Sequence, residues 1–217
     1  APWMRTSCDI DILVHDEQLD VAVKALTQTG YRVEGNKHYH DINLYAPGGM
    51  HLELHHNIKE REEKMDKVLD NVWQYSIKVN DVEYAESPEF FLFHHIAHMA
   101  YHFIHGGCGI RSFIDLWIFE NEIEIDDTKY RDLLRQANLE KFEEYAFKLM
   151  HYWLDDGAAD EQILNMQHYI LTGSTYGSAE KSVVIGNYKA GSKFKYFLNR
   201  IFMPLDDLAT IYPKPYK

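Results

Sequence analysis

The fold of the N-terminal part of the chain is indicated most clearly by the segment Cys8-Asp9-Ile10-Asp11-Ile12-Leu13-Val14. Acidic and aliphatic residues alternate in it before it becomes wholly apolar, which is typical of a strand entering a buried sheet. Because side chains alternate across a strand, Asp9 and Asp11 leave one face while Ile10 and Ile12 enter the other. Two carboxylates on one face repel, and a divalent cation between them would relieve that repulsion.

The residues after this strand predict a small α/β unit. A helix is expected over residues 16–29, because apolar and polar residues mix there without Gly or Pro and Gly30 follows as a C-cap. Three short strands are then expected over residues 31–34, 38–45 and 50–55, and the turn Pro47-Gly48-Gly49 joins the last two.

The rest of the chain is mainly helical in its pattern, apart from a strand-like patch over residues 77–84. Ser87-Pro88-Glu89 is a strong helix start, with a capping serine, a proline in the first turn and an acid beside it. Helices are expected over residues 60–74, 88–105, 110–121, 127–137, 141–154 and 161–171. We therefore expect an α+β protein. A small mixed or antiparallel sheet with helices, residues 1–58, precedes a mainly α-helical region, residues 59–217.

A third acid, Glu53, lies in the last expected strand between Leu52 and Leu54. If this strand neighbours the first one, three carboxylates converge on one face of the sheet. Such a group suits two-metal phosphoryl transfer, in which one ion activates an attacking hydroxyl and the other neutralises the leaving pyrophosphate. An acid-x-acid pair on a strand is also common at sheet edges, so the pattern alone leaves a purely structural role open.

The run of residues 5–14, the helix ending in Gly30-Tyr31 and the hairpin ending in Leu52-Glu53-Leu54-His55 resemble the nucleotidyltransferase superfamily of DNA polymerase beta. In particular, the chain resembles little-characterised bacterial nucleotidyltransferases. The resemblance implies transfer of a nucleoside monophosphate from an NTP to an acceptor hydroxyl or phosphate, with release of pyrophosphate and with Mg²⁺ or Mn²⁺ as cofactor. It makes Asp9, Asp11 and Glu53 the metal ligands and catalytic residues.

The same resemblance suggests which residues contact the nucleotide or the acceptor: Arg5, Ser7, His55, His98, His102, Arg111 and Asp115. Other interpretations stay open for several of them. Arg111 is four residues before Asp115 and would form an ion pair with it on a helix. Histidines can equally line a helix interface, each satisfied by a backbone or carboxylate partner.

The superfamily places a Gly-Ser turn about ten residues before the acid pair, where it cradles the triphosphate. Only eight residues precede Asp9 here, and none is glycine. We therefore expect the chain to be part of a longer protein. A second hypothesis is a nucleotidyltransferase-like module without catalysis that serves in binding or regulation.

A third hypothesis is a His-rich metallohydrolase. His94, His98, His102 and His105 are spaced to form one stripe on the helix that begins after Ser87. The stripe lacks the Glu of the His-Glu-x-x-His signature, and we place this hypothesis last.

The composition limits the kinds of partner that the protein is expected to bind. The 217 residues include 34 Asp and Glu against 22 Lys and Arg, and the resulting net charge of -12 argues against binding of extended nucleic acid. No segment is long and apolar enough to span a membrane. Two cysteines cannot form a disulfide framework, so we expect a cytoplasmic protein.

Overall fold

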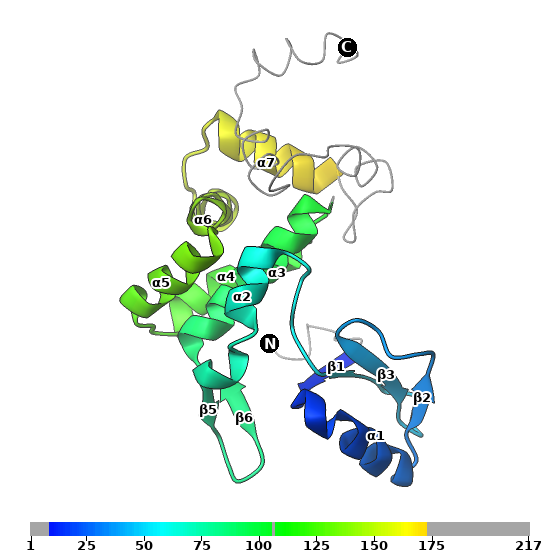
Figure 1. Ribbon diagram of the computed structural model, residues 1–217. Coiled ribbons are helices and arrows are strands. Elements are labelled where there is room, and N and C mark those ends of the chain that lie inside the picture. The colour runs from blue at the N-terminus through cyan, green and yellow to red at the C-terminus, as the bar shows by residue number, and fades with distance from the viewer. Residues whose placement is uncertain (1–8, 106, 173–217) are drawn as a thin grey trace. The chain divides into compact units, whose positions relative to one another are not determined.

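The computed structural model describes residues 9–105 and 107–172. The chain divides into two compact units, Ala1–Asp70 and Asn71–Lys217 (Figure 1). The first unit contains a four-stranded sheet, and the described part of the second is a two-stranded hairpin followed by helices. The expected α+β class is thereby confirmed.

The sheet of the first unit is mixed. Its strands are β1 (Asp9–Leu13), β2 (Arg32–Glu34), β3 (Asp41–Tyr45) and β4 (His51–His55), and they lie in the order β1-β4-β3-β2. Strand β1 runs parallel to β4, whereas β3 runs antiparallel to both of its neighbours. The parallel pair therefore places the first and the last strand of the unit side by side.

Strict alternation gives this sheet one apolar face. Ile42, Leu44, Leu52 and Leu54 are buried together with Leu19 of helix α1 (Leu19–Gln28), which follows a 3-10 turn, Asp16–Gln18. These side chains form the core of the unit, since apolar residues at every second position of a strand must be covered. The polar residues between them are consequently directed to the opposite face of the sheet.

Gly30 ends helix α1, as the sequence predicts. Its backbone has a φ of 99°, and the amide of Tyr31 donates to the carbonyl of Leu26, so the last turn closes in a left-handed cap. A Cβ at Gly30 would lie 3.0 Å from Cγ of Pro47 in the β3–β4 turn. Both the conformation and the close approach therefore favour glycine at this position.

Helix α2 (Glu63–Leu69) ends the first unit, and a 3-10 turn, Val72–Tyr75, begins the second. The helix expected over residues 60–74 is thus shorter and interrupted. The strand-like patch at 77–84 is instead a hairpin of β5 (Ser76–Lys78) and β6 (Tyr84–Glu86). Asn80 causes the reversal, because its side-chain oxygen accepts from the amides of Val82 and Glu83.

Helices make up the rest of the described second unit, close to the expected ranges: α3 (Pro88–Ile104), α4 (Ile110–Glu122), α5 (Asp127–Ala137), α6 (Glu140–Leu154) and α7 (Glu161–Thr172). Ser87 caps α3 by accepting from the amide of Phe90, and Asp126 caps α5. The core between the helices is aromatic: Phe90, Phe93, Phe103, Phe113 and Phe142 are buried. Across the described residues, no helix combines the length and the apolar character that crossing a membrane requires.

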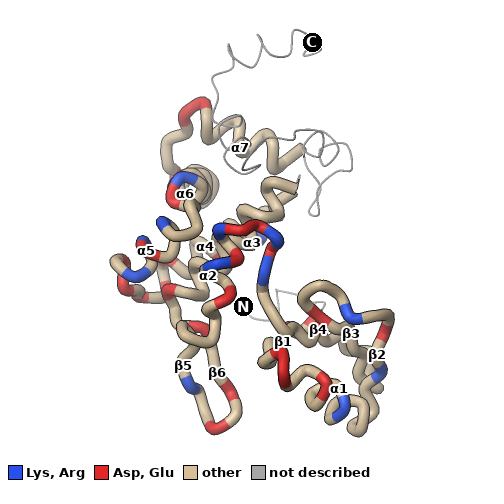
Figure 2. The backbone as a smooth tube through the Cα atoms, viewed as in Figure 1, with Lys and Arg blue, Asp and Glu red and all other residues tan. Residues whose placement is uncertain are grey.

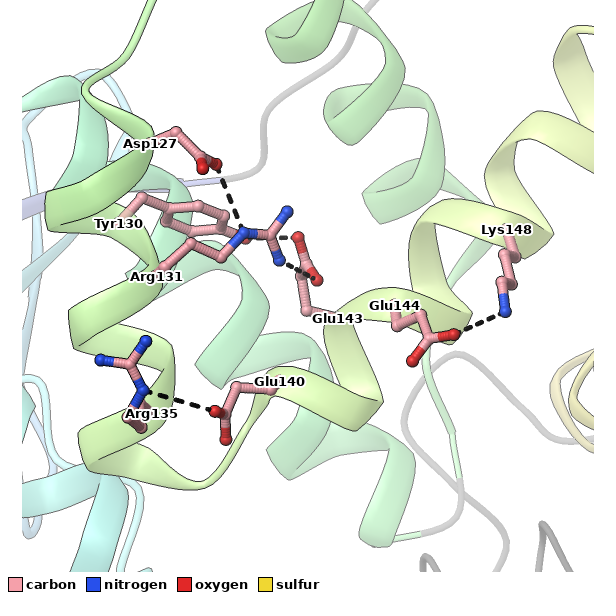
Figure 3. Close-up of polar contacts among 8 residues, drawn as sticks. All are labelled: Asp127, Tyr130, Arg131, Arg135, Glu140, Glu143, Glu144 and Lys148. Atoms are coloured by element: carbon pink, nitrogen blue, oxygen red, sulfur yellow. Dashed lines mark hydrogen bonds and ion pairs between the residues drawn. The ribbon is translucent and has the colours of Figure 1, made fainter.

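A polar contact links α5 to α6 beneath the surface (Figure 3). Arg131 Nη1 lies 3.0 Å from Oε2 of Glu143, whose side chain is only 6% exposed, and the Tyr130 hydroxyl donates to the same carboxylate. Burial raises the pKa of Glu143, while the Arg131 guanidinium opposes that rise. The arginine therefore offsets part of the cost of burying this acid.

Candidate active site

The pairing of β1 with β4 brings the acidic residues of the first unit together. In the parallel register, Asp9 lies opposite His51 and Asp11 lies opposite Glu53, and Figure 2 shows the acidic positions along β1. Leu52 and Leu54 of β4 pack with Leu19 of α1, and side chains alternate along both strands, so these polar residues share the other face. Ile10 and Ile12 are 43% and 41% exposed, so the edge strand β1 is less buried than its sequence pattern predicts. The register with β3 extends the polar face to Asp41, Asn43 and Tyr45.

Histidine and carboxylate groups converge closely on this face. His55 Nε2 lies 3.0 Å from Asp11 Oδ1 and 3.5 Å from Glu53 Oε2. Two groups of three residues offer ligand atoms within 4.8 Å of one another, namely Asp9, His51 and Glu53 and then Asp11, Glu53 and His55. Glu53 is common to both, so the three carboxylates converge, as the strand pattern predicts.

The charges on this face are crowded. The pKa of Glu53 is raised by burial first and then by the carboxylates of Asp11 and Asp41. Burial would lower the pKa of His55, but its hydrogen bond to Asp11 and the surrounding negative charges outweigh burial and raise it. The neighbouring carboxylates contribute to both shifts, and a bound cation would relieve the negative potential that they create.

Neighbouring side chains fix the two histidine rings. His51 Nε2 donates to the side-chain oxygen of Asn43, and the ring stacks on Tyr45 with centroids 4.7 Å apart. His55 stacks on His40 with an interplanar angle of 9°, and its Nδ1 atom is buried. The imidazoles are therefore held in place at the rim of the acidic face.

Our sequence analysis missed Asp41 and Asn43 as part of this face. The signal was present, because Asp41-Ile42-Asn43-Leu44-Tyr45 alternates polar and apolar residues as β1 and β4 do. Asp41 is almost fully buried and lies 3.1 Å from Nδ1 of His38. It adds to the negative potential beside Glu53.

These residues fit a divalent cation. Carboxylate oxygens are the preferred protein ligands of Mg²⁺ and Mn²⁺, and imidazole is a common ligand of transition metals. Asp9, Asp11 and Glu53 come from two adjacent strands, so the hydrogen bonds of the sheet fix their spacing. Rigid strands are suitable supports for a metal site.

The chain matches, over residues 1–155, the model of a family described as uncharacterised nucleotidyltransferase. The chain belongs to this family. The match includes the whole sheet with its acidic face and extends through helix α6. Comparisons with curated proteins and with solved structures gave no match. The nucleotidyltransferase resemblance of the sequence is thus confirmed at the level of the family.

The sequence analysis also predicts six further contacts with the nucleotide or the acceptor. Arg5 and Ser7 fall outside the described residues. His98 and His102 lie on α3 with their Nε2 atoms 3.0 Å apart, and Arg111 and Asp115 lie on α4, so all four belong to the second unit. Their role in binding the nucleotide or the acceptor stays a prediction.

The histidines on helix α3 and at its C-terminal end have local partners. His94 Nδ1 lies 2.9 Å from Glu86 Oε1, His95 Nε2 donates to the carbonyl of Ser112, and His105 Nδ1 donates to the carbonyl of Tyr101. The groups of three potential metal ligands found in residues 9–105 and 107–172 include none of these histidines. Their contacts favour the helix-interface interpretation over a metallohydrolase centre.

In the described part of the second unit, three residues that the sequence did not suggest form a group of potential ligands: Glu120, His151 and Asp155. His151 lies between the two carboxylates, and Trp117 donates to Asp155. Because α4 and α6 are far apart in the chain, only their packing brings these residues together. The three side chains are 38–41% exposed and satisfy one another as an ion-pair cluster.

Proposed function

We propose that this protein transfers a nucleoside monophosphate from an NTP to an acceptor hydroxyl or phosphate and releases pyrophosphate. The convergence of Asp9, Asp11 and Glu53 on the polar face of the sheet, in a chain of a nucleotidyltransferase family, supports this proposal. Membership of the family supports the reaction class, and the geometry supports the position of the site.

Asp9, Asp11 and Glu53 would hold Mg²⁺ or Mn²⁺. When bound, the ions neutralise the charge of the triphosphate and favour ionisation of the attacking hydroxyl. The acceptor oxygen then bonds to the α-phosphorus while the bond from that phosphorus to the oxygen of the pyrophosphate breaks. The proton of the acceptor passes to the Glu53 carboxylate.

The acceptor we propose is small. The net charge of -12 repels a long polyanion, whereas a triphosphate is neutralised locally by the ions it brings. His55 flanks the carboxylates, so it would lie beside the bound nucleotide. Arg5, Ser7, His98, His102, Arg111 and Asp115 are further proposed contacts of the nucleotide or acceptor.

The reaction class can be tested with labelled nucleotides. The full chain is incubated with Mn²⁺ or Mg²⁺, deproteinised cell extract as a source of acceptors, and each of four NTPs carrying ³²P at either the α or the γ position. We expect new species that carry the α label and contain no γ label. Transfer of the γ label, with the α label left in a nucleoside diphosphate, would indicate a kinase and contradict the proposal.

A paired variant controls this experiment. Asp9→Asn with Asp11→Asn should abolish the transfer of the α label, because it removes two ligands at once. Asp20→Asn, an exposed acid on α1, should leave the transfer unchanged. Equal transfer by the double variant would show that the reaction occurs at another site. Metal-dependent nucleotide binding without transfer would favour the non-catalytic module.

A further inference from the structure

His55 occupies an unusual place on the acidic face. Its side chain is 16% exposed, and Nε2 is within 3.5 Å of oxygens from both Asp11 and Glu53. The Nδ1 atom is buried, so Nε2 is the ring nitrogen that is directed at the carboxylates. An imidazole nitrogen thus lies beside the two carboxylates that would share a cation.

The two distances from His55 Nε2 to the carboxylate oxygens match the spacing of ligands around one ion. Two donors about 2.1 Å from an ion are about 3.0 Å apart when they subtend 90° and about 3.4 Å apart at a tetrahedral angle. His55 Nε2 lies 3.0 Å from the Asp11 oxygen and 3.5 Å from the Glu53 oxygen. The side chains are therefore already spaced for coordination.

We propose that His55 is a direct ligand of the catalytic ion and that the site consequently prefers Mn²⁺, or another transition-metal ion, over Mg²⁺. This inference rests on the proposed function. A set of carboxylates alone suits Mg²⁺, whereas imidazole is a ligand for transition metals, and affinities for mixed sites rise along the first-row series. His51 lies on the same strand, but its Nε2 contacts the side-chain oxygen of Asn43 instead of a carboxylate. Nε2 of His55 contacts both Asp11 and Glu53, so we assign the ligand role to His55, whose Nε2 would give up its proton when the ion binds.

Pulsed electron paramagnetic resonance of Mn²⁺ bound to the full chain tests the ligand directly. A coordinated imidazole gives ¹⁴N modulation of the electron spin echo, and we expect this modulation in the wild-type protein. It should be lost in His55→Gln and kept in His56→Gln. His56 is a matched control, because it is the next residue and is paired with Asp16 instead. Loss of the modulation in His51→Gln but not in His55→Gln would overturn the assignment.

Competition between Mn²⁺ and Mg²⁺ tests the preference. The signal of free Mn²⁺ reports how much ion the protein binds as Mg²⁺ is added. His55→Gln should weaken Mn²⁺ binding by at least about tenfold and change Mg²⁺ binding less, because it removes a nitrogen ligand. The inference is wrong if both ions bind equally well to the wild-type protein. It is also wrong if His55→Gln has the same ratio of Mn²⁺ to Mg²⁺ affinity as the wild type.

The outcomes separate this inference from the proposed function. Mn²⁺ binding that requires Asp9 and Asp11 but shows no ¹⁴N modulation would remove His55 as a ligand and leave the carboxylate site intact. His55 would then act only by orienting the carboxylates. Mn²⁺ binding that is unaffected by Asp9→Asn with Asp11→Asn would instead contradict the site on which the proposed function depends.

Discussion

Asp11 and Glu53 are cross-strand partners on the parallel strands β1 and β4, and their carboxylates share one face of the sheet. Without a cation, this pairing opposes folding, because two negative charges lie side by side and one is half-buried. With a cation, the same pairing becomes a binding site. Removing one of the two charges should therefore affect the metal-free and the metal-bound protein differently.

Glu53→Gln should leave the metal-free protein as stable as the wild type, or more stable by up to about 1 kcal/mol at pH 7. The pKa of Glu53 is higher in the folded than in the unfolded chain, so ionisation of Glu53 costs stability as the pH rises through the folded pKa. In the variant, the free energy of unfolding should no longer fall with rising pH for this reason. Urea unfolding in EDTA between pH 4 and pH 8 measures the pH dependence of that free energy.

Mn²⁺ should then raise the melting temperature of the wild type and not that of Glu53→Gln, because only the wild type has the complete ligand set. Glu34→Gln, an exposed acid on β2 of the same sheet, is the matched control and should respond like the wild type. A clear loss of stability of Glu53→Gln in EDTA would argue that Glu53 is a structural residue.

Arg131→Met should destabilise the second unit by about 2 kcal/mol at pH 7, because Glu143 would remain buried without its cation. The value lies below that of fully buried pairs, since the Arg131 side chain is 46% exposed. The pKa of Glu143 is already raised by burial. The penalty should therefore shrink as the pH falls through that pKa, and denaturant titrations at pH 7 and pH 5 measure the difference.

Arg135→Met provides the comparison on the same helix. Arg135 pairs with Glu140 (Figure 3) and with Asp132, and both of these acids are about half-exposed. Its loss should cost less than about 0.5 kcal/mol and show little dependence on pH. Equal effects of the two substitutions would mean that the burial of Glu143 is unimportant for stability.

His95 should make the second unit sensitive to acid. Burial lowers its pKa, and its Nε2 donates to the carbonyl of Ser112. The unfolded chain binds the proton more readily, so stability is full above the unfolded pKa near 6.5 and is lost as the pH falls below it. His95→Gln should reduce the pH dependence of the free energy of unfolding between pH 7.5 and pH 5.5. The same substitution at the exposed His105 should not.

Ser87 should contribute through its cap at the start of α3. Ser87→Ala removes the acceptor for the amide of Phe90 and should cost about 1 kcal/mol. Ser87→Asn keeps a capping oxygen and should cost much less. Thermal unfolding of both variants compares them, and equal losses would exclude capping as the cause.

The sequence predicted most accurately those features that depend only on residues within one helix or strand. Alternation in β1 placed Asp9 and Asp11 on one face, and the Ser87-Pro88-Glu89 start predicted α3 to within a residue. Such signals are local, because the period of a strand and the chemistry of a cap depend on neighbouring residues. The local sequence was therefore sufficient to predict which of these segments are helices and which are strands.

Contacts between elements could not be predicted in this way. His55 meets Asp11 only because β4 pairs with β1 in one parallel register, and a shift of a single residue would move Glu53 to the apolar face. The ion pair of Arg131 with Glu143 likewise depends on how α5 packs against α6. These relationships are set by tertiary packing rather than by local pattern.

Calorimetry with nucleotides that cannot release pyrophosphate shows whether the sheet binds a nucleotide through a metal ion. Each of four α,β-methylene NTPs, which cannot release pyrophosphate, is titrated calorimetrically into the full chain with Mn²⁺ present. We predict that at least one binds, that EDTA abolishes the binding, and that Asp9→Asn with Asp11→Asn abolishes it while Asp20→Asn does not. Binding that persists unchanged in EDTA or in the double variant would contradict a metal-dependent nucleotide site on this sheet.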